Sequence, residues 1–575
     1  MKKNNNNRNP WVINTEILSD SEIKNYFVDN GKYLLELQDN ESYLIEGCRG
    51  SGKTMLMKYS ELELLENFEE TKILPIYISF SDSLKLDRYN SNDDSSKNEI
   101  FIRWSISKII KELIATYTKK LGYEIDMNSS FERFFKSNSH KTIVNDLPTF
   151  INDLEIIKDE IDIKNISINY ELLWDRTVDI AYFKQFINEF IEKHHISNII
   201  FYFDEAAHTL FPYQQELFFT IFKKLKSNII ACKASVYPLI THYGNDFQQS
   251  QDAKKISVDK DDESENLMDF FQSFYNKRIH DDSRKEILEN NLGDETFKTI
   301  VYSSSGNPRR FLNLIEKIRQ DKKITKAKLT SIIREHSHNE LWEYHTKLVQ
   351  GNIDLRGYAE VGRKFIEEYI IPKLQDANKK PRDRKVRSFA IESEANDDFK
   401  KMLKTLEYSG IIDFKKQLQL REGNVGNYYT LNLSLCFSEN ILTINDIGRT
   451  DLNNATSLTA NSPIIKKYTT KILELFSSNC PKCKARVDTN SHKFCPNCGN
   501  DLRGIENVFE KMLSHSIDSL KIQLIGDKIR ERLKNKFHII KDLMDAEDGE
   551  IMKIQAVGVK RLEYIRIAIK DYISG

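Results

Sequence analysis

The sequence predicts an α/β protein whose first half is built on a mostly parallel β-sheet. Short apolar strands alternate with helical stretches from about Tyr33 to Asn266, which is the pattern of a parallel sheet covered by helices. The expected buried strands lie at 43–47, 73–80, 198–203 and 228–237. A hydrophobic content of 40 % supports real cores, and 575 residues suggest roughly four domains.

Composition and periodicity divide the chain into seven segments. We expect an N-terminal arm (1–32), a sheet-containing base (33–265) with a helical insert (about 97–195), a helical lid (266–345), a winged-helix-like domain (350–450), a linker (451–470), a cysteine-containing ribbon (471–503) and a small helical domain (504–575). The acidic run at 259–265 is expected to be a solvated boundary.

The net charge and the hydropathy of the chain limit how it could bind nucleic acid or a membrane. The formal net charge is −1, so any nucleic-acid surface must be a local patch. No run approaches eighteen apolar residues, and the first ten residues have no apolar core of a signal peptide. We therefore expect a cytoplasmic protein without a membrane partner.

A glycine-rich loop follows the first expected strand. GCRGSGKT fits the pattern G-x-x-x-x-G-K-[ST] and opens an apolar-periodic helix, as phosphate binding by a P-loop requires. Its backbone N–H groups would surround the phosphates, Lys53 would reach the β- and γ-phosphates, and Thr54 would hold Mg²⁺. The alternative is a simple glycine-rich turn. The predicted nucleotide-binding residues are Gly47, Cys48, Arg49, Gly50, Ser51, Gly52, Lys53 and Thr54.

A second strand, IIFYFDE, ends in two carboxylates. We expect Asp204 to join the magnesium shell and Glu205 to orient or polarise the attacking water, which favours an ATP hydrolase over a protein that only binds ATP. A strand ending in solvated acids is the alternative. In the next strand, Ser235 is chosen over Lys233 as a side chain that could sense the γ-phosphate; both could instead face solvent.

Two arginines begin a later helix. In SSSGNPRRFL, Asn307 can cap the helix and Pro308 suits its first position, which places Arg309 and Arg310 at the positive end of the helix dipole. Two positive charges at this end of the dipole are mildly unfavourable, and an anion opposite them would offset that unfavourable energy. The hypothesis is that Arg309 reaches the γ-phosphate; pairing with local acids is the alternative, and Arg310 is assigned a structural role.

The chain resembles AAA+ ATPases of the origin-recognition and replication-initiator type in four motifs, which occur in the order GCRGSGKT, IIFYFDE, KASVYP and GNPRR. The segment NPW at 9–11 is also similar to the start of bacterial members. The resemblance covers about residues 9–345, or to 450 with a winged helix. It implies ATP hydrolysis, a homo-oligomer, and Arg309 as the sensor-two residue. It also implies an arginine finger, for which Arg278 is only a guess. Without such a finger, turnover could be slow, or ATP could act mainly as an assembly signal.

A helix followed by a hairpin at about 399–435 resembles a winged helix-turn-helix. Upstream, KKPRDRKVR combines six basic residues with one acid, which could hold a DNA backbone. A solvated basic loop and a protein-binding winged helix are the alternatives. The DNA-contact candidates here are Lys379, Lys380, Arg382, Arg384, Lys385 and Arg387.

Four cysteines in two C-x-x-C pairs predict a structural Zn²⁺ site. Cys480, Cys483, Cys495 and Cys498 can supply four thiolates, and an eleven-residue spacer allows tetrahedral closure with no open position for water. The segment resembles a zinc ribbon, whose partner could be nucleic acid or protein. His492 is expected to be a bystander.

The C-terminal stretch resembles a pair of helix-hairpin-helix motifs, in which backbone N–H groups hold a DNA phosphate. Both hairpins lack the first glycine of the motif, and Lys560 and Arg561 remain candidate phosphate contacts. A helical bundle that binds protein is a close competitor.

Together these observations predict a multidomain ATPase with ATP, Mg²⁺ and Zn²⁺ as cofactors, which couples its nucleotide state to double-stranded DNA or to assembly. Mobile-element or anti-phage defence biology is a hypothesis from the resemblance alone. The alternative is a nucleotide-gated signalling or scaffold switch whose tail recruits a protein effector.

Overall fold

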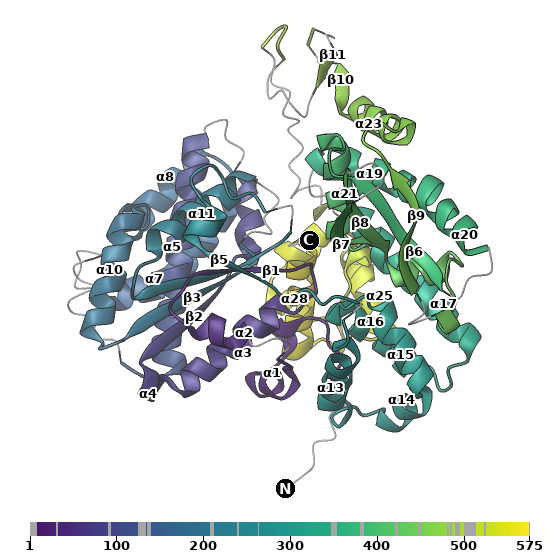
Figure 1. The fold of residues 1–575 in the computed structure, drawn as a ribbon. Helices are drawn as coiled ribbons and strands as arrows, with labels where there is room; N and C mark the ends of the chain where they lie inside the picture. The colour runs from purple at the N-terminus through teal and green to yellow at the C-terminus, as the bar shows by residue number, and fades with distance from the viewer. Residues whose placement is uncertain are drawn as a thin grey trace. The chain divides into compact units, whose positions relative to one another are not determined.

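The computed structural model describes residues 9–573 apart from 30–32, 90–93, 125–133, 135–139, 207–211, 239–240, 263, 347–352, 380–383, 420–423, 447–449, 480–481, 484–485, 489–494, 500–512 and 523–524. The chain forms two compact units, which are described separately: one of residues 14–258 with 509–575, and one of residues 1–13 with 259–508 (Figure 1).

The first unit contains the predicted parallel sheet. Its strands are β1 (Tyr43–Glu46), β2 (Ile73–Ser79), β3 (Asn198–Asp204), β4 (Ile230–Val236) and β5 (Lys254–Ser257). They pair in parallel in the order β2-β3-β4-β1-β5. In β3 and β4 nearly every residue is buried, because helices cover both faces of the sheet, so apolar residues are continuous rather than alternating. The expected α/β class is confirmed.

Helices precede the first strand of this sheet and connect its strands along the chain. Those near β1 are α1 (Asp20–Tyr26), α2 (Tyr33–Gln38), α3 (Lys53–Glu66) and α4 (Phe68–Thr71), preceded by the 3₁₀ turn η1 (Thr15–Ile17). After β3 come α11 (Pro212–Leu225) and α12 (Gln249–Asp252). The predicted arm is therefore folded from Asn14 to Tyr26, since Ile23 and Tyr26 are buried.

The long segment between β2 and β3 is helical. It contains η2 (Ser81–Arg88), α5 (Asp94–Ala115), η3 (Thr116–Lys120), α7 (His140–Ile156), α8 (Glu160–Asn169), α9 (Glu171–Arg176) and α10 (Ile180–Lys193). Aromatic and branched apolar side chains of α5, α7 and α10 join a core on one face of the sheet, to which strands β1 to β4 all contribute.

The C-terminal residues fold as a small helical domain within the same unit. They form η8 (Ile517–Ser519), α25 (Asp527–Lys536), α26 (Ile540–Asp545), α27 (Asp548–Met552) and α28 (Val559–Ile573) around a core that includes Leu533, Leu543 and Ile565. Whether this domain is a true helix-hairpin-helix pair stays a prediction.

The second unit begins with a helical bundle. Its helices are α13 (Leu267–Ile279), α14 (Lys285–Asn291), α15 (Asp294–Ser303), α16 (Pro308–Gln320), α17 (Lys326–His336) and the π-turn η4 (Ser337–Trp342). Trp11 is buried here and its indole donates to Asp282 Oδ2 at 2.7 Å, so the N-terminal NPW segment is anchored to this bundle.

A four-stranded sheet and its helices follow. The strands β6 (Lys385–Glu392), β7 (Ile412–Gln419), β8 (Val425–Leu431) and β9 (Thr450–Leu458) pair in the order β7-β8-β6-β9. The accompanying elements are α19 (Ile353–Phe365), η5 (Ile366–Ile370), α20 (Ile371–Lys379), α21 (Asp397–Tyr408), α22 (Leu433–Ser438), η7 (Ile444–Asp446) and α23 (Pro463–Phe476), and β10 (Ser477–Asn479) pairs with β11 (Arg486–Asp488) farther on.

Two expectations for this unit need correction. The expected linker 451–470 contributes most of strand β9 and half of α23, because a polar strand can pair along the edge of a sheet without apolar alternation. The expected solvated boundary 259–265 includes Asp262, which is only 4 % exposed, since Arg387 and Lys415 neutralise it.

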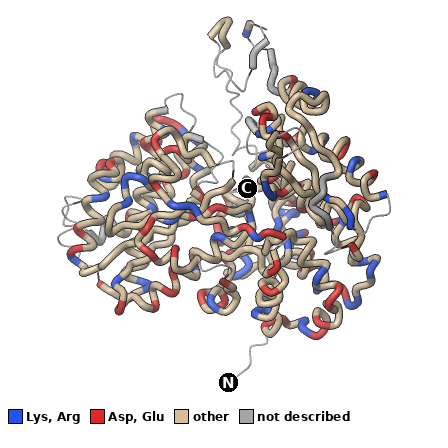
Figure 2. Tube along the Cα trace, in the orientation of Figure 1, with Lys and Arg blue, Asp and Glu red and all other residues tan. Residues whose placement is uncertain are grey.

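Charge is spread over both units. Figure 2 shows basic and acidic residues interspersed along the described trace, in keeping with the net charge of −1. Among the described residues, no helix is both long and apolar enough to cross a membrane.

Candidate nucleotide site

The P-loop connects β1 to α3. Gly50 and Gly52 have φ of 86° and 102°, which side chains other than glycine rarely adopt, and Gly52 immediately precedes the first helical residue, Lys53. Since no side chain caps this helix, its first backbone N–H groups are available for phosphate oxygens.

Lys53 lies within the loop that it would serve. Its side chain is buried, and its ammonium donates to the carbonyls of Gly47 at 2.5 Å and Cys48 at 3.1 Å. The same ammonium lies 3.9 Å from the centre of the Tyr237 ring. A phosphate oxygen could replace the two carbonyls as an acceptor.

The P-loop and the acidic strand end meet at the carboxyl edge of the sheet. The Thr54 hydroxyl donates to Asp204 Oδ2 at 2.6 Å, and the Tyr77 hydroxyl donates to the same oxygen at 2.8 Å. Asp204 is 2 % exposed. A hydroxyl and a carboxylate at this distance are oxygen donors of the kind that Mg²⁺ takes beside nucleotide phosphates, so the residues fit the predicted ion.

Glu205 follows Asp204 in the left-handed region, with φ of 60°. Its backbone N–H donates to Ser235 Oγ at 2.9 Å and to Asp204 Oδ1 at 3.0 Å, which holds the turn in this unusual conformation. Burial, followed by the charges of Asp204 and Glu16, raises the pKa of Glu205 to about 8. A positive φ at a half-buried acidic residue with a raised pKa is a feature of functional sites.

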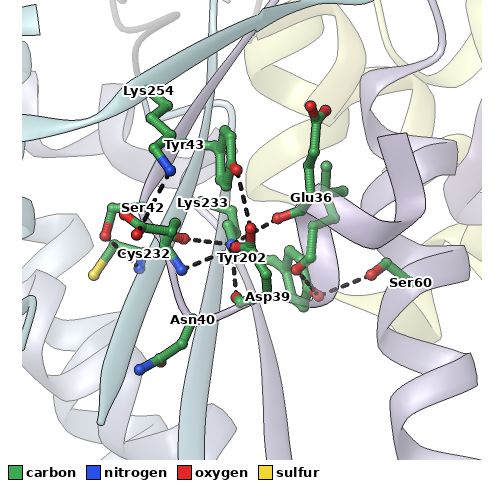
Figure 3. A network of polar contacts seen from close by, with 12 residues as sticks. Glu36, Asp39, Asn40, Ser42, Tyr43, Ser60, Tyr202, Cys232, Lys233 and Lys254 are labelled. Atoms are coloured by element: carbon green, nitrogen blue, oxygen red, sulfur yellow. Dashed lines mark hydrogen bonds and ion pairs between the residues drawn. The ribbon is translucent and has the colours of Figure 1, made fainter. Parts of the chain in front are cut away.

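The two polar residues of β4 lie differently. Ser235 is fully buried beside Ile45 of β1, and its hydroxyl orients the backbone of Glu205; a direct role toward γ-phosphate stays a prediction. Lys233 is the central residue of β4 and pairs with Tyr43, the first residue of β1. Figure 3 shows its ammonium among oxygens of Glu36 and Asp39, and it also donates to the Glu41 carbonyl, so it anchors the α2–β1 turn.

Sequence reasoning missed three residues at this edge: Tyr77, Tyr237 and Glu16. Tyr77 is a polar residue on a buried strand, which was the available signal, and burial followed by the Asp204 charge raises its pKa. Glu16 lies in η1, far from the P-loop in sequence, and carries no motif.

The arginines at the start of α16 belong to the second unit. Asn307 caps the helix by accepting from the Arg310 N–H at 3.2 Å, as the sequence predicts. Arg310 Nη2 donates to the Ser409 carbonyl at 3.2 Å, next to Gly410. Arg309 is partly exposed, and its proposed role is taken up below. Arg278, the guessed arginine finger, is buried against the Phe274 ring, which does not suit a residue that reaches a neighbouring subunit.

Three of the four predicted zinc ligands lie together. The Sγ atoms of Cys483, Cys495 and Cys498 are within 4.8 Å of one another, and those of Cys483 and Cys495 are 3.6 Å apart. Bonds of about 2.3 Å to one tetrahedral Zn²⁺ place sulfurs at such separations, so the thiols fit the ion. Cys480 and His492 lie outside the described residues.

The DNA-contact candidates divide in the structure. Arg387 is 2 % exposed and forms a bidentate pair with Asp262 at 3.1 Å, so its assignment as a phosphate contact was wrong; β6 turns its side chain inward. Lys379, Arg384, Lys560 and Arg561 are exposed. Lys385 is partly exposed and donates to the Asn378 carbonyl, and Lys380 and Arg382 lie outside the described residues.

A parallel sheet with a P-loop and an acidic strand end at one edge defines a protein of the P-loop α/β class. Residues 12–296 match the family model described as ORC-CDC6-like.

Two solved structures are similar to this chain. The ORC1 protein of Aeropyrum pernix in complex with DNA shares 11 % identity, with 77 % of this chain and 97 % of that chain covered and a TM-score of 0.34. The ORC2 protein of the same organism, in ADPNP–ADP complexes, shares 12 % identity over 71 % and 90 % of the two chains, with a TM-score of 0.24. Because both scores are below 0.5, the fold assignment rests on the strand order and the P-loop. No curated protein matches the chain.

Proposed function

We propose that this protein is an ATP-binding and ATP-hydrolysing AAA+ protein of the ORC-CDC6-like kind, which couples its nucleotide state to DNA binding or assembly. The observation that carries the proposal is the Thr54–Asp204 hydrogen bond of 2.6 Å. It joins the P-loop to the acidic strand end, and both lie within the segment that the family model matches.

Each site residue is assigned a role. Lys53 binds the β- and γ-phosphates, Thr54 and Asp204 hold Mg²⁺, and Glu205 orients the attacking water. The metal would neutralise charge that develops on the phosphate oxygens. Ser235 supports Glu205 through the hydrogen bond to its backbone, which fixes the position of the carboxylate relative to the sheet edge.

Arg309 is proposed as the sensor-two residue, which contacts the γ-phosphate from the lid. Its position in the first turn of α16, capped by Asn307, supports this role, because cations there are offset only by an anion. Hydrolysis would remove that anion and release the lid.

DNA contacts are proposed for the exposed basic residues Lys379, Arg384, Lys560 and Arg561, with Lys385, Lys380 and Arg382 in the same basic stretch. The Cys480, Cys483, Cys495 and Cys498 thiolates are proposed to hold a structural Zn²⁺. We further propose a cytoplasmic homo-oligomer, whose use in mobile-element or defence biology remains a hypothesis.

A switch that recruits a protein effector is the second candidate. The observation that favours it is the burial of Arg387, which removes one of the six basic residues from the predicted DNA-binding stretch. In that case the zinc ribbon or the helical domain would hold the effector.

Steady-state ATP hydrolysis with and without duplex DNA tests the proposal. We expect turnover that DNA stimulates and that Lys53→Ala and Arg309→Ala abolish. Glu205→Gln should lower kcat by about 10²–10⁴-fold while ATP binding is retained, because it removes only the group that acts on water. Turnover indifferent to DNA, with no DNA binding in the same samples, would exclude the DNA-linked function and favour the effector switch.

A further inference from the structure

The C-terminal helical domain contacts the base near the acidic edge of the ATP site. Helix α28 packs against η1 and η2, which follow the N-terminal residues and β2 respectively. Two ion pairs join the elements: Lys570 Nζ lies 3.2 Å from Glu16 Oε1, and Arg88 Nη2 lies 3.4 Å from Asp545 Oδ1. These two ion pairs and the packing of α28 fix the position of the C-terminal domain on the base.

Lys570 points away from the core of its own domain. The apolar residues of α28, such as Leu562, Ile565 and Ile569, pack inward, whereas the Lys570 side chain is 29 % exposed beside Glu16. Burial lowers the pKa of Lys570, but the charges of Asp82, Glu16 and Glu205 outweigh burial and leave that pKa above its ordinary value. The side chain is therefore a persistent cation among three carboxylates.

This edge of the site has an excess of negative charge. Phe80, the residue before η2, donates its backbone N–H to the Asp204 carbonyl at 2.9 Å, so η2, against which α28 packs, begins at this edge. The charges of Asp204 and Glu16 both raise the pKa of Glu205, and a bound nucleotide would add phosphate charge. The charges of Arg49 in the P-loop and of Lys570 both act on the pKa of Glu205 in the opposite sense. The neighbouring Asp82 also pairs with Lys85 of η2 at 3.0 Å and with Lys108 of α5 at 3.4 Å. The ion pair of Lys570 itself is with Glu16.

We propose that Lys570 is a positioning residue of the ATP site, supplied by the docked C-terminal domain, so that ATP turnover depends on this domain being in place. Lys570 holds Glu16 at the edge of the site and offsets the negative charge around Glu205. The proposal rests on the proposed ATPase function, because it describes how the same site is completed.

The test uses the full chain and four variants: Lys570→Gln, Lys570→Arg, Glu16→Gln and, as a matched control, Lys528→Gln at an exposed lysine of α25. The measurements are kcat and KM for ATP, affinity for a non-hydrolysable ATP analogue, and hydrogen exchange of α28. We expect Lys570→Gln and Glu16→Gln each to lower kcat at least fivefold with KM within twofold, Lys570→Arg to keep at least half of kcat, and the control to be unchanged.

The outcomes separate the proposals. Wild-type turnover that Lys570→Gln leaves within twofold would overturn the positioning role alone. Equal loss in Lys570→Arg and Lys570→Gln would also overturn it, because shape rather than charge would then matter. If Lys570→Gln releases α28, as faster exchange would show, a further variant, Arg88→Gln, decides, since it removes the Arg88–Asp545 ion pair of the docked domain and leaves Lys570 and Glu16 in place. Loss of kcat in Lys570→Gln but not in Arg88→Gln supports the positioning role, and equal loss in both overturns it. A wild-type chain without any turnover would overturn both the ATPase function and this proposal.

Discussion

At the scale of single residues, Lys233 shows how a buried charge can be structural. Its side chain is fully buried, and its ammonium donates to the Glu36 carbonyl and to the carbonyl and Oδ1 of Asp39, each at 2.9 Å, and to the Glu41 carbonyl. The Tyr43 ring lies 4.6 Å away. This one side chain therefore closes the turn between α2 and β1, at the end of the sheet opposite to the P-loop.

Replacing Lys233 with methionine should lower the free energy of unfolding by about 3 kcal/mol, because buried acceptors lose their donor. Lys254→Met is the matched control: this lysine faces the same Tyr43 ring but is 59 % exposed, and its loss should cost less than about 0.5 kcal/mol. Urea denaturation of the full chain, followed by tryptophan fluorescence, measures both. Equal costs would contradict the anchoring role.

The same lysine predicts a dependence of stability on pH. Burial lowers the pKa of Lys233 to about 8, against 10.5 for the ordinary side chain. Between these values the unfolded chain binds more protons than the folded chain, so the Lys233 contribution to the free energy of unfolding rises with pH. The difference between wild type and Lys233→Met should therefore grow from pH 8 to pH 10. A constant difference in that window would show that its pKa is not lowered.

At the scale of elements, we predict that the cysteine ribbon depends on Zn²⁺ for its shape. The β10–β11 pair is only three residues long, and three cysteines gather beside it with Cys495 buried. Such a short pairing has little apolar surface to bury, so a metal is the expected source of its stability.

We expect one Zn²⁺ per chain by atomic absorption, and none after Cys495→Ser, because three thiolates hold the ion less tightly than four. Lys482→Ala, in the same turn, should keep the metal. ATP turnover without DNA should be unchanged in both variants. Full metal content in Cys495→Ser would exclude the four-cysteine site.

The turn before α16 places a glycine where no side chain fits. Gly306 has φ of 74°, and a Cβ there would lie 2.3 Å from the Lys260 carbonyl oxygen. Gly306→Ala should cost about 2–4 kcal/mol of stability, from the left-handed conformation and the clash. Gly293→Ala has open space and φ of −67°, and should cost at most about 1 kcal/mol. Calorimetry of both variants provides the comparison; similar melting temperatures would contradict the predicted clash.

At the scale of the whole molecule, the exposed basic residues Lys560 and Arg561 of the C-terminal helical domain are proposed to contact DNA. Replacing both Lys560 and Arg561 with alanine should weaken duplex DNA binding uniformly across sequences. It should also reduce the slope of log K against log salt by about 2, since each phosphate contact contributes about 0.9. Fluorescence anisotropy at several salt concentrations measures this slope. Lys528→Ala should leave the slope unchanged, and an equal change in that variant would indicate non-specific charge attraction.

The parts of the site that follow local rules could be predicted from the sequence. The P-loop is one contiguous stretch, Asp204 and Glu205 end a buried strand, and Asn307 caps α16, so each has a local pattern. Side-chain direction was harder to predict. Arg387 lies in a basic run, yet its strand turns it toward Asp262, a partner 125 residues away. No local pattern contains that information.

The sequence by itself determined the α/β class, the P-loop, the acidic strand end and the clustering of cysteines, because these depend on short-range spacing and on hydrophobic periodicity. Only the tertiary structure decided that Asp262 is buried with Arg387, that Tyr77 donates to Asp204, and that Lys570 of the last helix lies beside Glu16 of the first turn. These contacts join residues far apart in the chain. The physical reason is that burial and charge pairing depend on which surfaces meet when the chain folds, which residue spacing does not encode.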